Sequence, residues 1–156
     1  MSDFLLKLGL DLPLTGSPEQ KIYKGPNPSE VAVVAADFNG LKPKMLIEEG
    51  ENVDRGTPLF CHKDQPGVLY VSPAKGKIKS VCRGSRRLLQ SVIVDVSDAD
   101  DPGPKYCEPT KVGVLTVDDI RTILQKSGLW ISFLTRPYSK VPEENGAPIA
   151  IFVNAM

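Results

Sequence analysis

The stretch from residue 44 to residue 96 constrains the fold most, because short apolar runs alternate there with glycine and proline. The apolar runs cover residues 45–47, 59–60, 68–71 and 92–94. Runs of this length between turn-forming residues are typical of short strands joined by tight turns. Gly50 and Gly56 stand where the chain must reverse with a positive φ, which glycine adopts most easily. The pattern therefore predicts a small unit of β-hairpins.

Two turns in this stretch resemble those of biotinyl and lipoyl carrier domains. Residues 49–59 (EGENVDRGTPL) are similar to the carrier turn EGD-x-V-x-x-G-x-x-L, and residues 72–78 (SPAKGKI) are similar to the carrier corner APxxGKI. The resemblance covers about a third of the chain. It implies a barrel-sandwich hybrid domain of curved hairpins over roughly residues 44–96.

Carrier domains of this kind attach their cofactor to a lysine at the tip of a tight hairpin before that corner. Lys63 is the only lysine so placed, but its neighbours His62 and Asp64 depart from the carrier pattern. Pro66 and Gly67 suit the two central positions of a type II turn, so we expect them to occupy the hairpin tip instead. We therefore expect Lys63 to carry neither biotin nor lipoate, and the scaffold to have a structural use.

Composition excludes several classes of function. The net charge is +0, so no overall field attracts nucleic acid or an anionic membrane. No apolar run approaches the ~20 residues of a membrane-spanning helix, and the first residues lack the features of a signal peptide. The three cysteines, Cys61, Cys82 and Cys107, are widely spaced without a C-x-x-C pair, which predicts no metal site, no iron–sulfur cluster and no disulfide framework. We expect them to be free cytosolic thiols.

The sequence also gives no catalytic constellation. His62 is the only histidine, and no phosphate-binding glycine loop or nucleophile elbow accompanies it. A single histidine without a placed nucleophile is most often incidental. No catalytic residue is therefore assigned.

The segments around the hairpin unit add three expectations. Residues 4–14 begin with strand-like apolar residues, and the six-residue apolar run over residues 31–36 predicts a strand buried on both faces. Residues 73–87 carry six basic side chains and no acidic one. They are read either as solvated strand faces or as a basic edge that docks an acidic partner or lipid headgroups.

A change of pattern near residue 104 predicts two domains, residues 1–104 and residues 105–156. The acidic Pro/Gly segment DADDPGP at residues 98–104 is the clearest linker. After it, Thr116 and Asp119 fit a capping box that begins a helix over residues 117–127, with Gly128 as its C-terminal signal. The apolar residues 149–153 predict a strand of the parallel, doubly covered kind. This second part is expected to be a truncated Rossmann-like α/β domain, giving a β-rich α+β chain.

Motifs along the whole chain resemble the A subunit of the sodium-translocating NADH:quinone reductases. They occur in family order, at residues 8–13 (LGLDLP), 16–20 (G-x-P-x-Q), 86–92 (RRLLQSV), 127–130 (SGLW), 135–137 (Thr-Arg-Pro) and 151–156 (IFVNAM). The resemblance implies the N-terminal part of a hydrophilic subunit that lies at the cytoplasmic face of the bacterial inner membrane. It also implies a complex that passes electrons from NADH through flavins to ubiquinone while it exports Na⁺, with this subunit near the membrane-embedded B subunit and the quinone. We expect the isolated chain to be inactive and to bind no cofactor of its own.

A more distant resemblance concerns the flavin-binding subunit of complex I and the C subunit of the Rnf complex. Residues 127–129 and 153–155 align with the two ends of their glycine-rich flavin motif, but the glycines between those ends are replaced by bulky residues. Arg136, Tyr138 and Lys140 leave a basic and aromatic group in that loop, and we take them as candidate anion or quinone-side contacts. Alternatively, Arg136 and Lys140 pair with nearby carboxylates. A flavin-binding fragment or a biotin/lipoyl-type carrier is the competing class of function.

Overall fold

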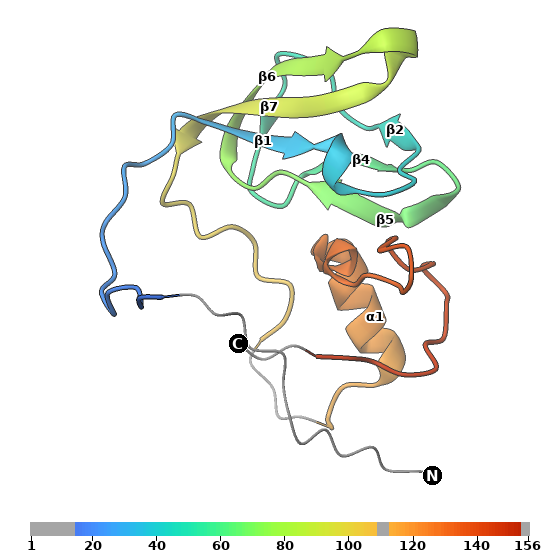
Figure 1. Cartoon of the computed structure of the whole chain (residues 1–156). Helices are drawn as coiled ribbons and strands as arrows, with labels where there is room; N and C mark the ends of the chain where they lie inside the picture. Colours follow the sequence, from blue (N-terminus) through green and yellow to red (C-terminus); the bar gives the residue numbers. More distant parts are fainter. Residues whose placement is uncertain (1–14, 109–112, 154–156) are drawn as a thin grey trace.

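The computed structural model of the chain describes residues 15–108 and 113–153 (Figure 1). Two antiparallel sheets are joined by short turns, and one α-helix follows them. The strands are β1 (Glu30–Val34), β2 (Pro43–Met45), β3 (Asn52–Val53), β4 (Pro58–His62), β5 (Gln65–Val71), β6 (Lys75–Arg83) and β7 (Leu89–Asp98). The helix is α1 (Val117–Lys126), and short 3₁₀ turns are η1 (Ala35–Asp37), η2 (Ser85–Arg87) and η3 (Leu129–Ser132).

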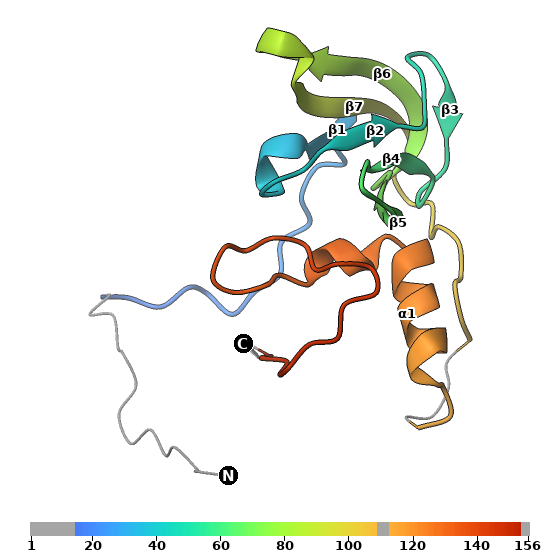
Figure 2. The ribbon, with the colours of Figure 1, turned by 90° about the vertical axis from the view of Figure 1, so that its right-hand side faces the viewer.

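The two sheets form two layers with the apolar core between them. One sheet has the order β1-β7-β6-β3 and the other the order β2-β4-β5. Figure 2 shows the sheets stacked, with α1 below β5. The four apolar runs read from the sequence overlap β2, β4, β5 and β7, so the predicted hairpin pattern is confirmed.

Aromatic side chains from the second sheet fill the centre of the core. Phe60 and Tyr70 lie opposite each other on β4 and β5, and their rings stack with centroids 4.6 Å apart. Phe38, from the loop before β2, meets the Tyr70 ring edge-on at 4.7 Å. Val92 and Val94 of β7 are fully buried in the same cluster. This cluster holds the two sheets together, because burial of large apolar side chains is the main source of stability in such a domain.

The two turns that resemble carrier domains have the geometry that their residues demand. Gly50 has φ 90° and Gly56 has φ 87°, as expected. At the corner, the buried Ser72 hydroxyl donates to the Ala74 carbonyl at 2.7 Å, while the Ser72 amide donates to Thr57. A Cβ on Gly76 would stand 1.9 Å from the Asp95 carbonyl oxygen, so only glycine lets β6 approach β7 here.

The predicted helix is confirmed, together with its capping box. Thr116 accepts from the Asp119 amide, and the Asp119 carboxylate accepts from the Thr116 amide. These hydrogen bonds to Thr116 lower the pKa of Asp119. Gly128 follows the helix with φ 73°. It lies so close to Val71 of β5 that a Cβ on Gly128 would clash with the Val71 methyl groups.

The expected double burial of residues 31–36 is wrong. Among the described strands, β1 lies at the edge of its sheet and pairs only with β7, and its side chains alternate between exposed and half-buried. Val31 and Val33 pack on the core, whereas Ala32 and Val34 face outward. A continuous apolar run does not reveal how many neighbours a strand has, and within residues 15–108 and 113–153 no strand pairs with the other side of β1.

The strand expected over residues 149–153 is also not formed. These residues lie outside the described strands, and Ile149, Ile151, Phe152 and Val153 are 67–107% exposed. A strand of the doubly covered kind needs paired neighbours, and none of the described strands lies beside this segment. Residues 4–14, where strand-like residues were noted, fall outside the described residues. The division into domains 1–104 and 105–156 stays a prediction.

Burial of Tyr70 leads to a testable pH dependence. Tyr70 is 1% exposed, and burial raises its pKa from the ordinary value of 10.0 to about 12. The neutral phenol therefore favours the folded state fully below pH 10, and this contribution is lost as the pH rises toward 12. We expect the free energy of unfolding, measured with urea, to fall over that interval.

The Tyr70→Phe variant is the control for this prediction. It keeps the stacked ring but removes the titrating hydroxyl, so its stability should change less between those pH values. A loss of stability equal to that of the original protein would show that Tyr70 is not the responsible group.

Candidate functional site

The loop that carries the three predicted site residues is a closed turn of its own. The Thr135 amide donates to the Lys140 carbonyl at 2.8 Å, and the Ser139 amide donates to the Thr135 carbonyl at 2.8 Å. Ser139 has φ 50° and the Arg136–Pro137 peptide bond is cis. The Tyr138 carbonyl accepts from the Asn39 side chain at 3.2 Å, which ties the turn to the loop between β1 and β2.

The side chains of Arg136 and Lys140 lie against different neighbours, and that of Tyr138 is exposed. The Arg136 guanidinium lies over the Phe152 ring, 5.5 Å from its centroid. The end of the Lys140 side chain lies beside Gly40, and Tyr138 is 73% exposed. Neither Arg136 nor Lys140 forms a salt bridge with a described carboxylate. Neither of the two hollows described below is lined by these three residues.

The β4–β5 hairpin differs from the expectation at its tip. His62 pairs with Gln65, so Lys63 and Asp64 form the two-residue turn, while Pro66 and Gly67 lie within β5. The expectation that Pro66 and Gly67 replace the lysine at the tip is therefore wrong. The register of β4 against β5 decides the tip, and it overrides the local preference of Pro-Gly for a turn.

The environment of Lys63 is polar and open. Its backbone amide donates to the Lys42 carbonyl at 2.7 Å, and its side chain is exposed. Beside it, Lys42 Nζ binds Asp64 Oδ2 at 2.8 Å. This hydrogen bond, assisted by the charge of Asp64, raises the pKa of Lys42, and the hydrogen bond from Lys42 lowers the pKa of Asp64. The geometry required of a carrier lysine, an exposed side chain at a tight hairpin tip, is thus present.

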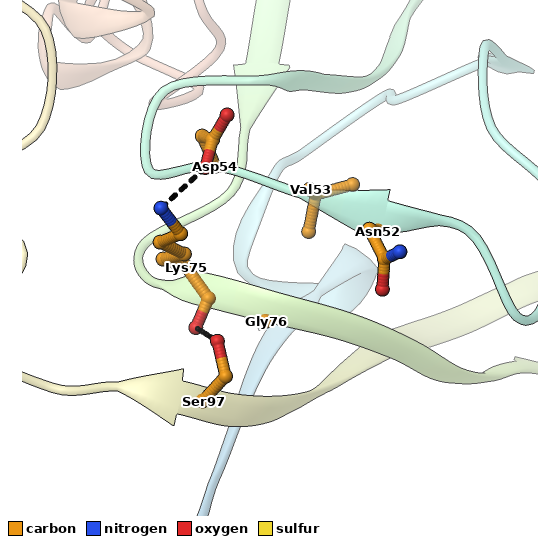
Figure 3. A pocket seen from close by; sticks show the side chains of 6 residues that line it. All are labelled: Asn52, Val53, Asp54, Lys75, Gly76 and Ser97. Carbon is orange, nitrogen blue, oxygen red and sulfur yellow. Dashed lines mark hydrogen bonds and ion pairs between the residues drawn. The ribbon is translucent and has the colours of Figure 1, made fainter.

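A small hollow lies where β3, the start of β6 and the end of β7 meet (Figure 3). It has a volume of about 290 Å³ and is lined by Asn52, Val53, Asp54, Lys75, Gly76 and Ser97. Lys75 Nζ lies 3.3 Å from Asp54 Oδ1, and Ser97 Oγ donates to the Lys75 carbonyl at 3.4 Å. Because Lys75 and Asp54 neutralise each other, the lining of the hollow favours neither an anion nor a cation.

A larger groove, of about 630 Å³, adjoins this hollow and runs along the linker. Arg55 closes part of it, because its Nη2 donates to the Ala99 carbonyl at 3.2 Å and its stem packs on Gly103. Tyr106 lies against Gly56. The groove results from the linker crossing the turn before β4, and its basic and acidic residues are mixed.

No group of histidine, cysteine and carboxylate side chains in residues 15–108 and 113–153 could hold a metal ion. Cys61 is buried, Cys82 is half-buried and Cys107 is exposed, and all three are free thiols. Within the same residues, no helix has the length and the hydropathy needed to cross a membrane.

Residues 125–144 form a contact with β5 that sequence reasoning missed. Glu144 accepts from the Gly67 amide at 2.7 Å and its own amide donates to Gln65 Oε1 at 3.2 Å. Gln125 donates to the Glu144 carbonyl, and Trp130, 8% exposed, joins the core cluster. The lone tryptophan was the one available signal, since a large aromatic residue after a helix usually marks a packing site.

Comparison with known proteins identifies the family. Residues 4–97 match the family described as the NqrA N-terminal barrel-sandwich hybrid domain, and residues 115–156 match the NqrA second alpha/beta domain. The chain belongs to the NqrA family. This membership confirms the family resemblance and the expected fold class, a barrel-sandwich hybrid followed by the start of an α/β domain.

Several relatives share one description, the A subunit of a Na(+)-translocating NADH-quinone reductase. The chain is 44% identical to the relative from Neisseria gonorrhoeae (strain NCCP11945) over 151 residues, which cover 97% of this chain and 34% of the relative. It is 42% identical to that of Glaesserella parasuis serovar 5 (strain SH0165) and 41% identical to that of Histophilus somni (strain 129Pt), with the same coverage. The chain thus spans about a third of the length of these relatives.

The divergent loop leads to a prediction about flavin binding. Flavin phosphates are usually held by bare backbone amides of a glycine-rich loop, whereas this loop presents bulky side chains, and Pro137 lacks an amide hydrogen. Titration of the purified protein with FMN should give no fluorescence quenching and no heat beyond dilution. Stoichiometric micromolar binding that is lost in Arg136→Ala, but kept in the exposed control Lys105→Ala, would contradict this prediction.

Proposed function

We propose that this chain is the N-terminal part of the A subunit of a Na⁺-translocating NADH:quinone reductase and acts there as a structural scaffold on the quinone side. The two family matches, in order along nearly the whole chain, support the assignment. The observation that supports a scaffold role is that β5 contacts both the sandwich core and the second family segment. One face of this strand belongs to the core of the sandwich, and residues 125–144 are hydrogen-bonded to the same strand.

The contact of residues 125–144 with β5 fixes the second family segment on the sandwich. The second family segment is seated on β5 by the Glu144 carboxylate, and Trp130 packs into the core. Trp130 Nε1 donates to the Pro142 carbonyl at 3.0 Å, which fixes the segment around the ring. The sandwich can therefore hold whatever follows in a set orientation without supplying a redox group itself.

In the proposed complex, electrons pass from NADH through flavins to ubiquinone, and Na⁺ is exported. This chain's subunit lies at the cytoplasmic face of the bacterial inner membrane as a peripheral component. Its partners are the other subunits, the membrane-embedded B subunit above all, with ubiquinone nearby. These cofactors belong to the complex, and this chain contributes no flavin, iron–sulfur cluster or metal ion. Nucleic acid is not a partner.

Weakening the contact between residues 125–144 and β5 should lower quinone reduction but not NADH oxidation. In a full-length protein assembled into its complex, Trp130→Ala removes a buried ring and weakens the hold on the second segment. We expect a several-fold loss of Na⁺-stimulated, NADH-driven quinone reduction, with NADH oxidation by an artificial electron acceptor unchanged. Leu134→Ala, at a side chain that is 59% exposed, is the matched control.

Two outcomes would contradict the proposal. If a tag on the full-length protein recovered no NADH:quinone reductase activity from membranes, the assignment to the complex would fail. If Trp130→Ala lowered both activities equally while the complex stayed intact, the quinone-side role would fail.

A carrier role at Lys63 is the second candidate, because the lysine does stand at an exposed hairpin tip. We expect no modification, since His62 and Asp64 depart from the flanking pattern of carrier lysines. Intact mass of the protein, expressed together with a biotin or lipoate ligase, should equal that of the unmodified chain. A mass increase that disappears in Lys63→Arg, but persists in the nearby Lys44→Arg, would instead establish a carrier.

A further inference from the structure

We propose that the tip of the β6–β7 hairpin docks on an anionic lipid surface. This inference goes beyond the assembly proposed above and does not depend on it, because it rests on the hairpin alone. The hairpin tip is here residues 83–88, from Arg83 through η2 to Leu88. It projects from the sandwich at the end away from α1 (Figures 1 and 2).

The hairpin tip carries a cluster of positive charges. Arg83, Arg86 and Arg87 are exposed, and none of them forms a salt bridge within residues 15–108 and 113–153. Residues 79–93 contain no acidic side chain. Farther down β6, Lys75 is paired with Asp54 and Lys79 with Glu30 and Asp95.

One carboxylate, that of Glu49, is fixed on β6 by a hydrogen bond near the tip. Glu49 Oε1 accepts from the Val81 amide at 2.6 Å, below the tip. The Arg83 guanidinium folds back to donate to the Arg87 carbonyl at 3.3 Å. This leaves the charges of Arg86 and Arg87 directed to solvent at the outermost turn.

The backbone holds these arginines in an unfavourable conformation. Arg86 has φ 56° and Arg87 has φ 61°, a region that residues with a Cβ seldom adopt. The turn is closed by the Gly84 amide on the Leu88 carbonyl at 2.8 Å and by the Leu88 amide on the Ser85 carbonyl at 3.2 Å. Strained residues that a folded turn maintains are found most often at functional sites.

An apolar side chain completes the surface. Leu88 is 65% exposed, although the next residue, Leu89, is 3% exposed and belongs to the core. A basic cluster with one protruding leucine suits a membrane interface, where arginine binds headgroup phosphates and the apolar side chain enters the headgroup region. A stable protein interface needs about 800 Å² per partner, which a tip of six residues does not provide. These observations favour a lipid surface over an acidic protein.

The test measures binding of the full-length protein to vesicles by flotation. Phosphatidylcholine vesicles are compared with vesicles in which about a third of the lipid is phosphatidylglycerol, because the negative surface potential of anionic lipids attracts basic clusters. We expect binding to the anionic vesicles only, and its loss at high salt, because the attraction falls off within a Debye length.

The charge-removing variant is Arg86→Gly combined with Arg87→Gly, because glycine accepts the positive φ of both sites and so preserves the turn. Loss of two arginines near an anionic surface should weaken binding about 30-fold. The matched control, Lys21→Gln combined with Lys24→Gln, removes two exposed positive charges from the segment before β1 and should bind unchanged. Leu88→Ser should weaken binding while its salt dependence remains.

Three results would overturn the proposal. These are equal binding of the protein to neutral and anionic vesicles, unchanged binding of the double glycine variant, and an equal loss of binding in the lysine control. If the double glycine variant does not fold, the Leu88→Ser variant and the lipid and salt comparisons on the original protein still decide the question. Failure to bind vesicles, together with loss of a protein partner in the glycine variant, would assign the tip to an acidic protein instead.

Discussion

The stacked pair Phe60 and Tyr70 is the interaction on which the rest of this structure depends. The two residues face each other across β4 and β5, and both are at most 1% exposed. Their rings hold the second sheet against Val92 and Val94 of the first sheet, so the pair sets the spacing of the sandwich. The register of this pair does not continue to the hairpin tip, because the pairing shifts between Cys61 and His62, after which His62 pairs with Gln65. This shift, outside the stacked pair, leaves Lys63 and Asp64 as the turn.

Those features that depend on neighbouring residues could be predicted from the sequence. The capping box of α1 and the positive φ at Gly50 and Gly56 follow from a few consecutive residues, and each is confirmed. The edge position of β1 could not be predicted, because apolar residues on an edge strand and on a central strand look alike. The tip of the β4–β5 hairpin was missed for a related reason, since pairing of His62 with Gln65 is a property of the sheet.

At the candidate site, too, contacts between residues far apart in the sequence could not be predicted. The loop with Arg136, Tyr138 and Lys140 was singled out for its composition, but Arg136 lies over Phe152, Lys140 lies beside Gly40, and Tyr138 is exposed. Neither the Asn39 contact to Tyr138 nor the Phe152 ring beneath Arg136 could be inferred, because each lies far away in the sequence. A fold and a family follow from patterns along the chain, whereas a site requires that particular side chains meet.

The linker between the two family segments does not behave as a free tether. An acidic stretch rich in proline and glycine normally indicates a flexible connection, yet Arg55 donates to Ala99 and packs on Gly103, and Tyr106 lies against Gly56. On the other side of α1, Glu144 and Trp130 anchor the chain to β5 and to the core. Because the segment is held both before and after the helix, α1 cannot rotate about the linker without breaking one of these contacts. These contacts fix the orientation of α1 against the barrel-sandwich, which is the property that the proposed scaffold role requires.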